Sequence, residues 1–199
     1  MNRNIYILAA LLFNAMIFFS SCGGDSDKYQ IDETWMRQNE KDFYAEAAKP
    51  EYKTIYGISD PYKYILWKES TFWSPSGSAI SKDPELRQSM RSPVFSDTIK
   101  CRYEGWFKDA NGNKVIFDST DNPTSFNPTT DPNRQERSMM VGGLVDGWRV
   151  ALYKMKEGDE WSLVIPFSLG YGMTRNNDIP ACTNLYFDIK LIEIVSKSN

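Results

Sequence analysis

The segment of residues 144–165, LVDGWRVALYKMKEGDEWSLVI, decides the fold of this 199-residue chain. Its first half carries apolar side chains at helical spacing, at Val145, Trp148, Leu152 and Met155. Such a stripe predicts an amphipathic helix over residues 144–156, which Gly158 ends. Strict alternation follows, with apolar side chains at Trp161, Leu163 and Ile165. This second half predicts a β-strand with one buried face.

Neighbouring segments predict further antiparallel strands. Residues 98–107 alternate, and one of their faces carries Ile99, Cys101, Tyr103 and Gly105. A turn at residues 109–112 leads into a return strand at residues 114–119, and residues 121–138 are polar and proline-containing, as in a long loop. The last strand alternates at Leu185, Phe187, Ile189 and Leu191. The fold class is therefore α+β, with an antiparallel sheet wrapped around a short central helix.

An N-terminal extension precedes this sheet. Residues 32–49 predict a helix that Asp32 caps and that ends before Pro50. Its apolar stripe consists of Trp35, Met36, Phe43 and Ala47. That stripe must pack either on the following domain or on a second copy of the chain, which would make a homodimer. We also expect a strand at residues 62–67 and a short helix at residues 84–90.

The N-terminus predicts export. Arg3 precedes an apolar run over residues 5–19, which is shorter than the ~20 residues that a membrane-spanning helix needs. Small residues then precede Cys22, so residues 1–21 are predicted to be a lipoprotein signal peptide and Cys22 the lipidated residue. An ordinary signal peptide with an incidental cysteine is the alternative. Residues 22–31 are a tether whose acids either direct the protein to the cell surface or only solvate a linker. The predicted location is the cell envelope, with the lipid anchor in the outer membrane.

Composition excludes several function classes. The chain has 23 basic and 26 acidic residues and a net charge of −3, so nucleic acid is not expected as a partner. It contains no histidine, the commonest general base and zinc ligand, and no metal site is expected. Cys101 and Cys182 could pair outside the cytosol, but two cysteines do not define a disulfide framework. Cys101 is predicted to be a small buried hydrophobe.

A set of short motifs resembles the FK506-binding-protein (FKBP) family of prolyl isomerases in order and spacing. The C-terminal half is matched by LVDGW at 144–148, MKEGD at 155–159, IP at 165–166, GYG at 170–172, IP at 179–180 and LYFD at 185–188. The N-terminal half is matched by YEG at 103–105 and FD at 117–118. The resemblance implies an FKBP-like domain over residues 93–199, with residues 32–92 as an extension.

The same resemblance implies a substrate pocket. Catalytic roles fall on Tyr103, Phe117, Asp118, Trp148, Tyr171 and Phe187, and substrate-binding roles fall on Leu144, Val145 and Ile179. Trp148 would form the floor beneath the proline ring. The sequence departs from the family at Thr124, where a phenylalanine is usual, at Asp178, where an apolar residue is usual, and in an insertion at residues 127–138. These departures bear on substrate preference and catalytic strength.

The implied activity is peptidyl-prolyl cis/trans isomerisation in protein folding. An X–Pro bond isomerises in tens to hundreds of seconds, and no bond is broken, so no cofactor, metal or general base is required. The implied partners are proline-containing polypeptides and FK506-like macrolides. The alternative is a weakly catalytic or non-catalytic chaperone or protein-binding lipoprotein with the same fold.

Overall fold

The computed structural model describes residues 31–57, 60–74, 83–121 and 136–195. Residues 31–199 form one compact unit. Its helices are α1 (Glu33–Ala47), α2 (Pro84–Ser89) and α3 (Asp146–Leu152). Its strands are β1 (Lys53–Tyr56), β2 (Tyr64–Glu69), β3 (Thr98–Lys108), β4 (Lys114–Ser119), β5 (Arg137–Met140), β6 (Glu160–Ile165) and β7 (Leu185–Val195).

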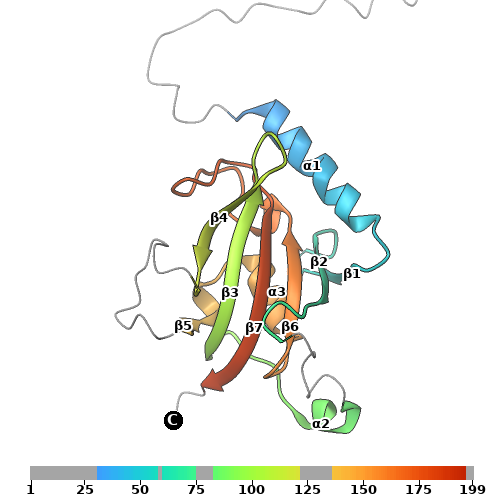
Figure 1. The fold of residues 1–199 in the computed structure, drawn as a ribbon, viewed down its shortest axis with the longest axis vertical. Coiled ribbons are helices and arrows are strands. Elements are labelled where there is room, and N and C mark those ends of the chain that lie inside the picture. The colour runs from blue at the N-terminus through green and yellow to red at the C-terminus, as the bar shows by residue number, and fades with distance from the viewer. Residues whose placement is uncertain (1–30, 58–59, 75–82, 122–135, 196–199) are drawn as a thin grey trace, which may run out of the picture. The chain divides into compact units, whose positions relative to one another are not determined.

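The strands form one antiparallel seven-stranded sheet in the order β1-β2-β6-β7-β3-β4, and β5 pairs with the start of β3. Figure 1 shows α3 behind the long strands β3, β7 and β6 and α1 beside the β2 edge. The predicted fold class, an antiparallel sheet around a short central helix, is confirmed. Pairing of β2 with β6 places the N-terminal extension in this same sheet. The division at residues 92 and 93 therefore stays a prediction.

The sheet separates two apolar layers, because neighbouring side chains along a strand point to opposite faces. The inner face packs on α3: Leu163, Phe187 and Trp148 belong to the main core. The outer face packs on α1 through a smaller cluster of Phe43, Leu66, Val164 and Tyr186. The alternation predicted for residues 98–107 is confirmed, since every second residue of β3 is buried.

Helix α1 packs on its own domain. Asp32 caps it, as predicted, by accepting from the Trp35 amide at 3.0 Å. The Trp35 indole donates to Thr183 at 2.9 Å, and the Asn184 amide donates to the Asn39 side chain at 2.9 Å. The Phe43 side of the predicted stripe is thus covered by the sheet. A homodimer through α1 stays a prediction.

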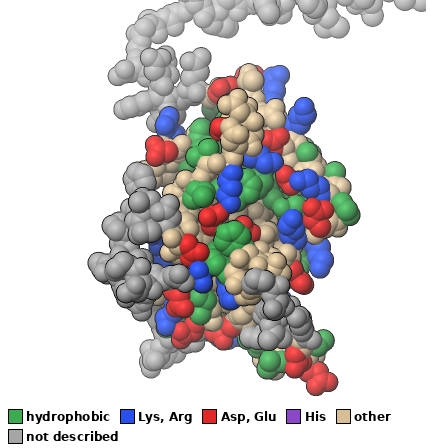
Figure 2. Space-filling model, viewed as in Figure 1, with side chains coloured by type: hydrophobic (Ala, Val, Ile, Leu, Met, Phe, Trp, Pro, Cys, Tyr) green, Lys and Arg blue, Asp and Glu red, His purple; other side chains and the backbone are tan. Residues whose placement is uncertain are grey.

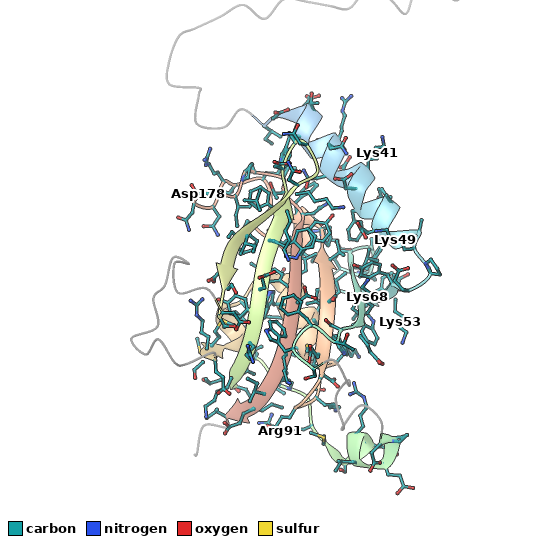
Figure 3. The ribbon with its side chains drawn as sticks, in the orientation of Figure 1. Lys41, Lys49, Lys53, Lys68, Arg91 and Asp178 are labelled. Carbon is teal, nitrogen blue, oxygen red and sulfur yellow. The ribbon has the colours of Figure 1, made fainter. Side chains whose placement is uncertain are left out.

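The extension differs from the sequence-based prediction at the β1–β2 hairpin. No strand was predicted at β1, whose four residues are mostly exposed and carry little apolar signal. Strand β2 begins at Tyr64, two residues later than predicted, because Asp60 and Tyr62 form a turn closed by the Tyr62 amide donating to the Asp60 carboxylate at 2.9 Å. Figure 3 shows Lys53 and Lys68, one from each strand, at this edge of the molecule.

Two predictions about the central region were wrong in extent. The central helix is shorter than residues 144–156: Leu144 and Val145 are extended, and the helix ends at Leu152. Met155 is still buried, so the apolar stripe was correct although the helical bounds were not. The predicted loop 121–138 is too long, because its last two residues belong to β5. The turn at residues 109–112 and the strand at residues 114–119 are confirmed.

Other predictions lie outside the described residues: the signal peptide 1–21, Cys22, most of the tether, Thr124 and most of the insertion. Within the described ranges, no helix is long and apolar enough to cross a bilayer. Cys101 is fully buried as predicted, and Cys182, predicted in a loop, is buried too. Both are free thiols. Basic and acidic side chains are interspersed on the face seen in Figure 2.

Candidate functional site

An aromatic cluster lies between α3 and the inner face of the sheet, where the resemblance implies a substrate pocket. Trp148, on α3, is only 3% exposed. The Tyr103 ring of β3 meets its indole edge-on at 5.4 Å between centroids, and the Phe187 ring of β7 does so at 5.2 Å, both at 88°. Phe117 of β4 meets Phe187 edge-on at 5.6 Å. Edge-to-face pairs of this kind favour fixed ring positions. The pocket floor and walls are therefore rigid.

A β-bulge in β4 places Phe117 and Asp118 at this pocket. Gly105 of β3 pairs with Asp118, but Trp106 pairs with Ile116, so Phe117 is an extra residue in the ladder. A bulge of this kind re-aims side chains at a sheet edge. Gly105 makes the arrangement possible, because a Cβ there would lie 2.5 Å from Phe187 and 2.8 Å from Phe117. This role of Gly105 could not be predicted from the sequence, because it depends on the bulge in β4.

A polar triad forms one edge of the pocket. The Tyr103 hydroxyl donates to the Asp118 carboxylate at 2.5 Å. Arg137 of β5 donates to both partners, at 2.8 Å to Asp118 Oδ2 and also to the Tyr103 hydroxyl. Its guanidinium lies over the Tyr103 ring at 5.4 Å. Asp118 Oδ1 has no hydrogen-bond partner among the described residues.

Arg137 was missed by the sequence analysis. It fell in the segment assigned to a polar loop, whereas β5 pairs antiparallel with β3 and brings Arg137 opposite Cys101. The available signal was the alternation of Arg137, Ser138 and Met139 directly before the LVDGW motif, in which Met139 packs against the main core.

Both pocket tyrosines stay protonated at neutral pH. Burial raises the pKa of Tyr103, and its hydrogen bond to Asp118 raises it further, while the Arg137 charge acts in the opposite direction. Burial also raises the pKa of Tyr171, a hydrogen bond with the Asn176 side chain opposes this, and the Asp118 charge adds to it. The Tyr103 hydroxyl already donates its proton to Asp118, so of the two hydroxyls only that of Tyr171 can donate to a further acceptor.

The backbone that enters α3 supplies another donor. Val145 is the N-cap of α3, and its carbonyl accepts from the amides of Trp148 and Arg149 at 3.0 and 3.2 Å. Among the described residues, no group accepts from the Val145 amide. The preceding carbonyl, of Leu144, is held by the Arg149 guanidinium at 2.7 Å. Leu144 and Val145 pack against the main core, and their substrate-binding role stays a prediction.

Ile179 reaches the pocket from a tight hairpin. The Asn176 and Ile179 backbones exchange hydrogen bonds of 3.0 and 2.9 Å across a turn in which Asn177 adopts a left-handed conformation with φ 52°. Asparagine tolerates that conformation better than most residues. Ile179 is buried in the main core, whereas Asp178 is exposed and lies at the surface in Figure 3. The departure at Asp178 thus adds a charge to the rim and leaves the wall apolar.

Five of the nine predicted residues contact one another directly: Tyr103, Phe117, Asp118, Trp148 and Phe187. Ile179 belongs to the same main core, and Leu144 and Val145 pack against it. The place of Tyr171 in the pocket and the roles of all nine residues stay predictions. In the part of the chain that is described, no group of three acidic, cysteine or histidine side chains could hold a metal ion. The arrangement combines packed aromatic rings with a hydroxyl donor and an amide donor. Such a site can bind and orient an amide.

Curated proteins with similar sequences are related through part of their length. The chain is 34% identical over 108 residues to the macrophage infectivity potentiator of Trypanosoma cruzi, which is 52% of this chain and 46% of that protein. It is 42% identical over 57 residues to the FKBP-type peptidyl-prolyl cis-trans isomerase FkpA of Buchnera aphidicola subsp. Schizaphis graminum, which is 29% of this chain and 23% of that protein. The chain thus spans less than half of the length of either relative.

Solved structures agree on the fold. A peptidyl-prolyl cis-trans isomerase from Pseudomonas syringae superimposes with a TM-score of 0.57 at 24% identity, covering 87% of this chain and all of the other. FkpA from Escherichia coli superimposes with a TM-score of 0.58 at 18% identity, covering 83% of this chain and 62% of the other. The model of the family described as FKBP-type peptidyl-prolyl cis-trans isomerase matches residues 90–192. The chain belongs to this FKBP-type family.

Proposed function

We propose that this protein is a peptidyl-prolyl cis/trans isomerase that assists protein folding in the cell envelope. The observation that carries the proposal is the buried Trp148 ring, flanked edge-on by Tyr103 and Phe187 and closed by a polar edge at Asp118. This cavity is apolar where a proline ring would lie and hydrogen-bonding where a peptide group would lie.

The chemistry requires only differential binding. Rotation about an X–Pro bond passes through a twisted amide that has lost its resonance and part of its charge separation. An enzyme accelerates rotation if it binds this twisted form better than either planar form. An apolar, water-poor cavity favours the less polarised amide. No proton needs to leave the protein, which fits two tyrosines that stay protonated.

The individual roles follow from position. Trp148 would support the proline ring, with Phe117, Ile179 and Phe187 as walls. Tyr103 and Asp118 would shape the edge near the rotating carbonyl, and Arg137 would hold both in place. The Tyr171 hydroxyl and the free Val145 amide would bind the substrate backbone. FK506-like macrolides would compete for the same cavity.

The cellular setting is proposed from the sequence. The charged start, the apolar run and the small residues before Cys22 support export and lipidation at that cysteine. Two acyl chains would hold the protein stably at a membrane, which one chain does only marginally. Its clients would then be proline-containing polypeptides that fold outside the cytosol.

A proline-isomerisation assay tests the activity. The purified protein is given a series of X–Pro peptides, and a macrolide competitor is added. We expect catalysis that the macrolide abolishes. Tyr171→Phe should retain part of it, with a loss of about threefold to tenfold, since one neutral hydrogen bond contributes ~0.5–1.5 kcal/mol. Tyr44→Phe, which changes an exposed tyrosine on α1, is the matched control and should be unchanged.

The alternative function is distinguished by the same samples. A folded protein that isomerises none of the peptides, but binds them equally well with and without proline, would be a chaperone or binding module. That outcome would reject the isomerase proposal and leave the fold assignment intact.

A further inference from the structure

A cavity lies on the side of α3 turned away from Trp148 and its aromatic neighbours. It has a volume of about 300 Å³. Helix α3 and its C-cap contribute Asp146, Arg149, Val150 and Tyr153. These positions follow the i, i+3, i+4, i+7 spacing of one helix face. Trp148, two positions after Asp146, lies on the other face. A single helix therefore separates the two sites.

The opposite wall comes from outside the family domain. Gly57, Asp60 and Lys63 belong to the turn of the β1–β2 hairpin, which precedes the residues that the family model matches. That turn is closed by its own hydrogen bonds, from the Gly57 amide to the Lys63 carbonyl at 2.7 Å and from the Lys63 amide to the Asp60 carbonyl at 3.2 Å. The cavity is thus preformed, and the extension builds it.

The lining combines an apolar floor with a charged rim. Val150 and Leu169 are buried at the floor, and the Phe95 ring at the rim is 61% exposed. The rim carries two ion pairs: Lys63 with Asp60 at 3.6 Å, and Arg149 with Asp146. Two cations and two anions give the rim no net charge, so it favours neither an anion nor a cation.

A polypeptide segment with an apolar side chain fits this chemistry. The volume is at the small end for ligand pockets, which suits one side chain better than a drug-sized molecule. An apolar side chain would cover Phe95 and fill the floor. On either side of it, the backbone N–H groups would donate to carboxylates at the rim, and the C=O groups would accept hydrogen bonds from its cationic side chains.

The two sites are close enough for one chain. Helix α3 is ~10 Å across, so a chain that passes around it covers ~16 Å, and an extended peptide advances ~3.3–3.6 Å per residue; about four to five residues therefore separate a proline in one site from an apolar residue in the other. Arg149 connects the sites physically, because it lines the second cavity and also holds the Leu144 carbonyl at 2.7 Å, next to Val145.

We propose that the cavity between α3, Phe95 and the β1–β2 turn is a second client subsite, which binds an apolar side chain of the polypeptide whose X–Pro bond is isomerised. This inference rests on the proposed isomerase function. It assigns the extension a part in client selection: the enzyme selects chains with an apolar residue about four positions from the proline.

The test compares three peptides on the full-length protein. One is a tetrapeptide with a single X–Pro bond; the others are about ten residues long, with leucine or serine about four positions from the same bond. We expect the leucine peptide to exceed the serine peptide in kcat/KM by about threefold to tenfold, as for burial of a few methylene groups. Phe95→Ala should remove this preference and leave the tetrapeptide rate unchanged.

Phe72→Ala is the matched control, since Phe72 is 49% exposed and does not line the cavity. It should keep the preference. Equal rates for the leucine and serine peptides in the unmodified protein, or equal losses in Phe72→Ala and Phe95→Ala, would overturn the proposal.

A binding measurement separates this inference from the proposed function. If no peptide is isomerised, a proline-free leucine peptide is titrated into the full-length protein and followed by NMR. Shifts at Tyr153 and Leu169 that Phe95→Ala abolishes would support the subsite even without catalysis. Their absence would reject it, whatever the isomerase assay shows.

Discussion

Two neighbouring residues of β7 face different regions of the molecule. The Phe187 ring points inward and packs on Trp148 at 5.2 Å, in the pocket. The Tyr186 ring points outward and stacks on Trp106 at 4.2 Å, in the cluster covered by α1. Both regions are aromatic and buried. The same alternating strand therefore builds a candidate site on one face and a structural seam on the other.

Polar groups distinguish the two regions better than burial does. On α1, the two carboxylate oxygens of Glu46 form ion pairs, one with Lys49 at 2.7 Å and the other with Lys108 at 2.9 Å. At the pocket, the Asp118 side chain is 25% exposed and Oδ1 has no partner among the described residues. The Tyr186 hydroxyl also lacks a partner there, but its residue is 4% exposed. Both unpaired atoms are themselves buried, so the regions differ in the exposure of the whole carboxylate, which is 25% for Asp118 and 9% for Glu46.

Trp148→Ala should have the largest effect. It removes the pocket floor, so we expect kcat/KM to fall by roughly 100-fold and stability to fall by ~3–5 kcal/mol, as for other buried Trp→Ala changes. The measurements are isomerase activity and denaturant unfolding of the same preparation. Trp148→Phe, which keeps a ring on α3, should recover part of both. Unchanged activity in folded Trp148→Ala would show that the pocket is assigned wrongly.

Phe43→Ala is the counterpart on the outer face. The ring contacts Tyr64 at 5.4 Å and belongs to the cluster with Leu66 and Val164. Its loss should cost ~3 kcal/mol in the free energy of unfolding, because a buried ring is replaced by a cavity. The kcat/KM of the folded fraction should stay within about twofold of wild type. A loss of activity as large as that of Trp148→Ala would mean that the two faces are coupled.

The sequence predicted the inner face better than the outer one. Alternation over residues 98–107 assigned Tyr103 to the buried side, and the motif pattern placed Trp148 and Phe187 together, because local periodicity and family spacing carry that information. The outer cluster was not predicted. Leu66, Val164 and Tyr186 meet only after three strands have paired, and sequence periodicity does not specify pairing.

The site itself was predicted incompletely for a related reason. Arg137 contributes to the polar edge through the pairing of β5 with β3, which a polar, proline-containing segment did not suggest. Gly105 was matched as part of a motif, but its absence of a side chain matters only because a bulge in β4 places Phe117 against it. The roles of Arg137 and Gly105 were missed because they depend on which strands pair, and the residue types alone do not specify that pairing.

Arg137→Met should weaken the polar edge while leaving the ring pocket intact. The variant loses the 2.8 Å contact with Asp118 and the contact with Tyr103. We expect kcat/KM to fall by about tenfold, since hydrogen bonds to charged groups contribute ~1.5–3 kcal/mol. Macrolide affinity, which depends mainly on the rings, should change less.

Arg102→Met provides the control for that prediction. Arg102 is the neighbour of Tyr103 on β3, but it pairs with Asp121 at 2.9 Å instead of with Asp118. Activity should stay near wild type. If both arginine variants lose the same activity, the effect comes from net charge and not from the triad.

Glu46→Gln should have the smallest effect and a distinctive pH dependence. Burial opposes ionisation of Glu46, but Lys49 and Lys108 outweigh it, so the pKa of this carboxyl is lowered from its ordinary value of 4.5. Its contribution to stability is present above pH ~4.5, where the unfolded chain is also ionised, and is lost as the pH falls through the folded pKa. The free energy of unfolding should therefore be ~1 kcal/mol lower in the variant than in the wild type at neutral pH, and this difference should become smaller in acid.

Glu33→Gln is the control, because Glu33 forms an exposed ion pair with Arg37 on the same helix. This variant should change the free energy of unfolding by ~0.5 kcal/mol or less. Because Glu46 is on α1 and pairs with Lys108 on the outer face of the sheet, its variant should keep normal kcat/KM at every pH where it is folded. A stability difference that does not depend on pH would show that Glu46 acts through packing. An altered kcat/KM would show that the cluster covered by α1 affects the pocket. The two faces of the sheet could then not be divided into a structural one and a functional one.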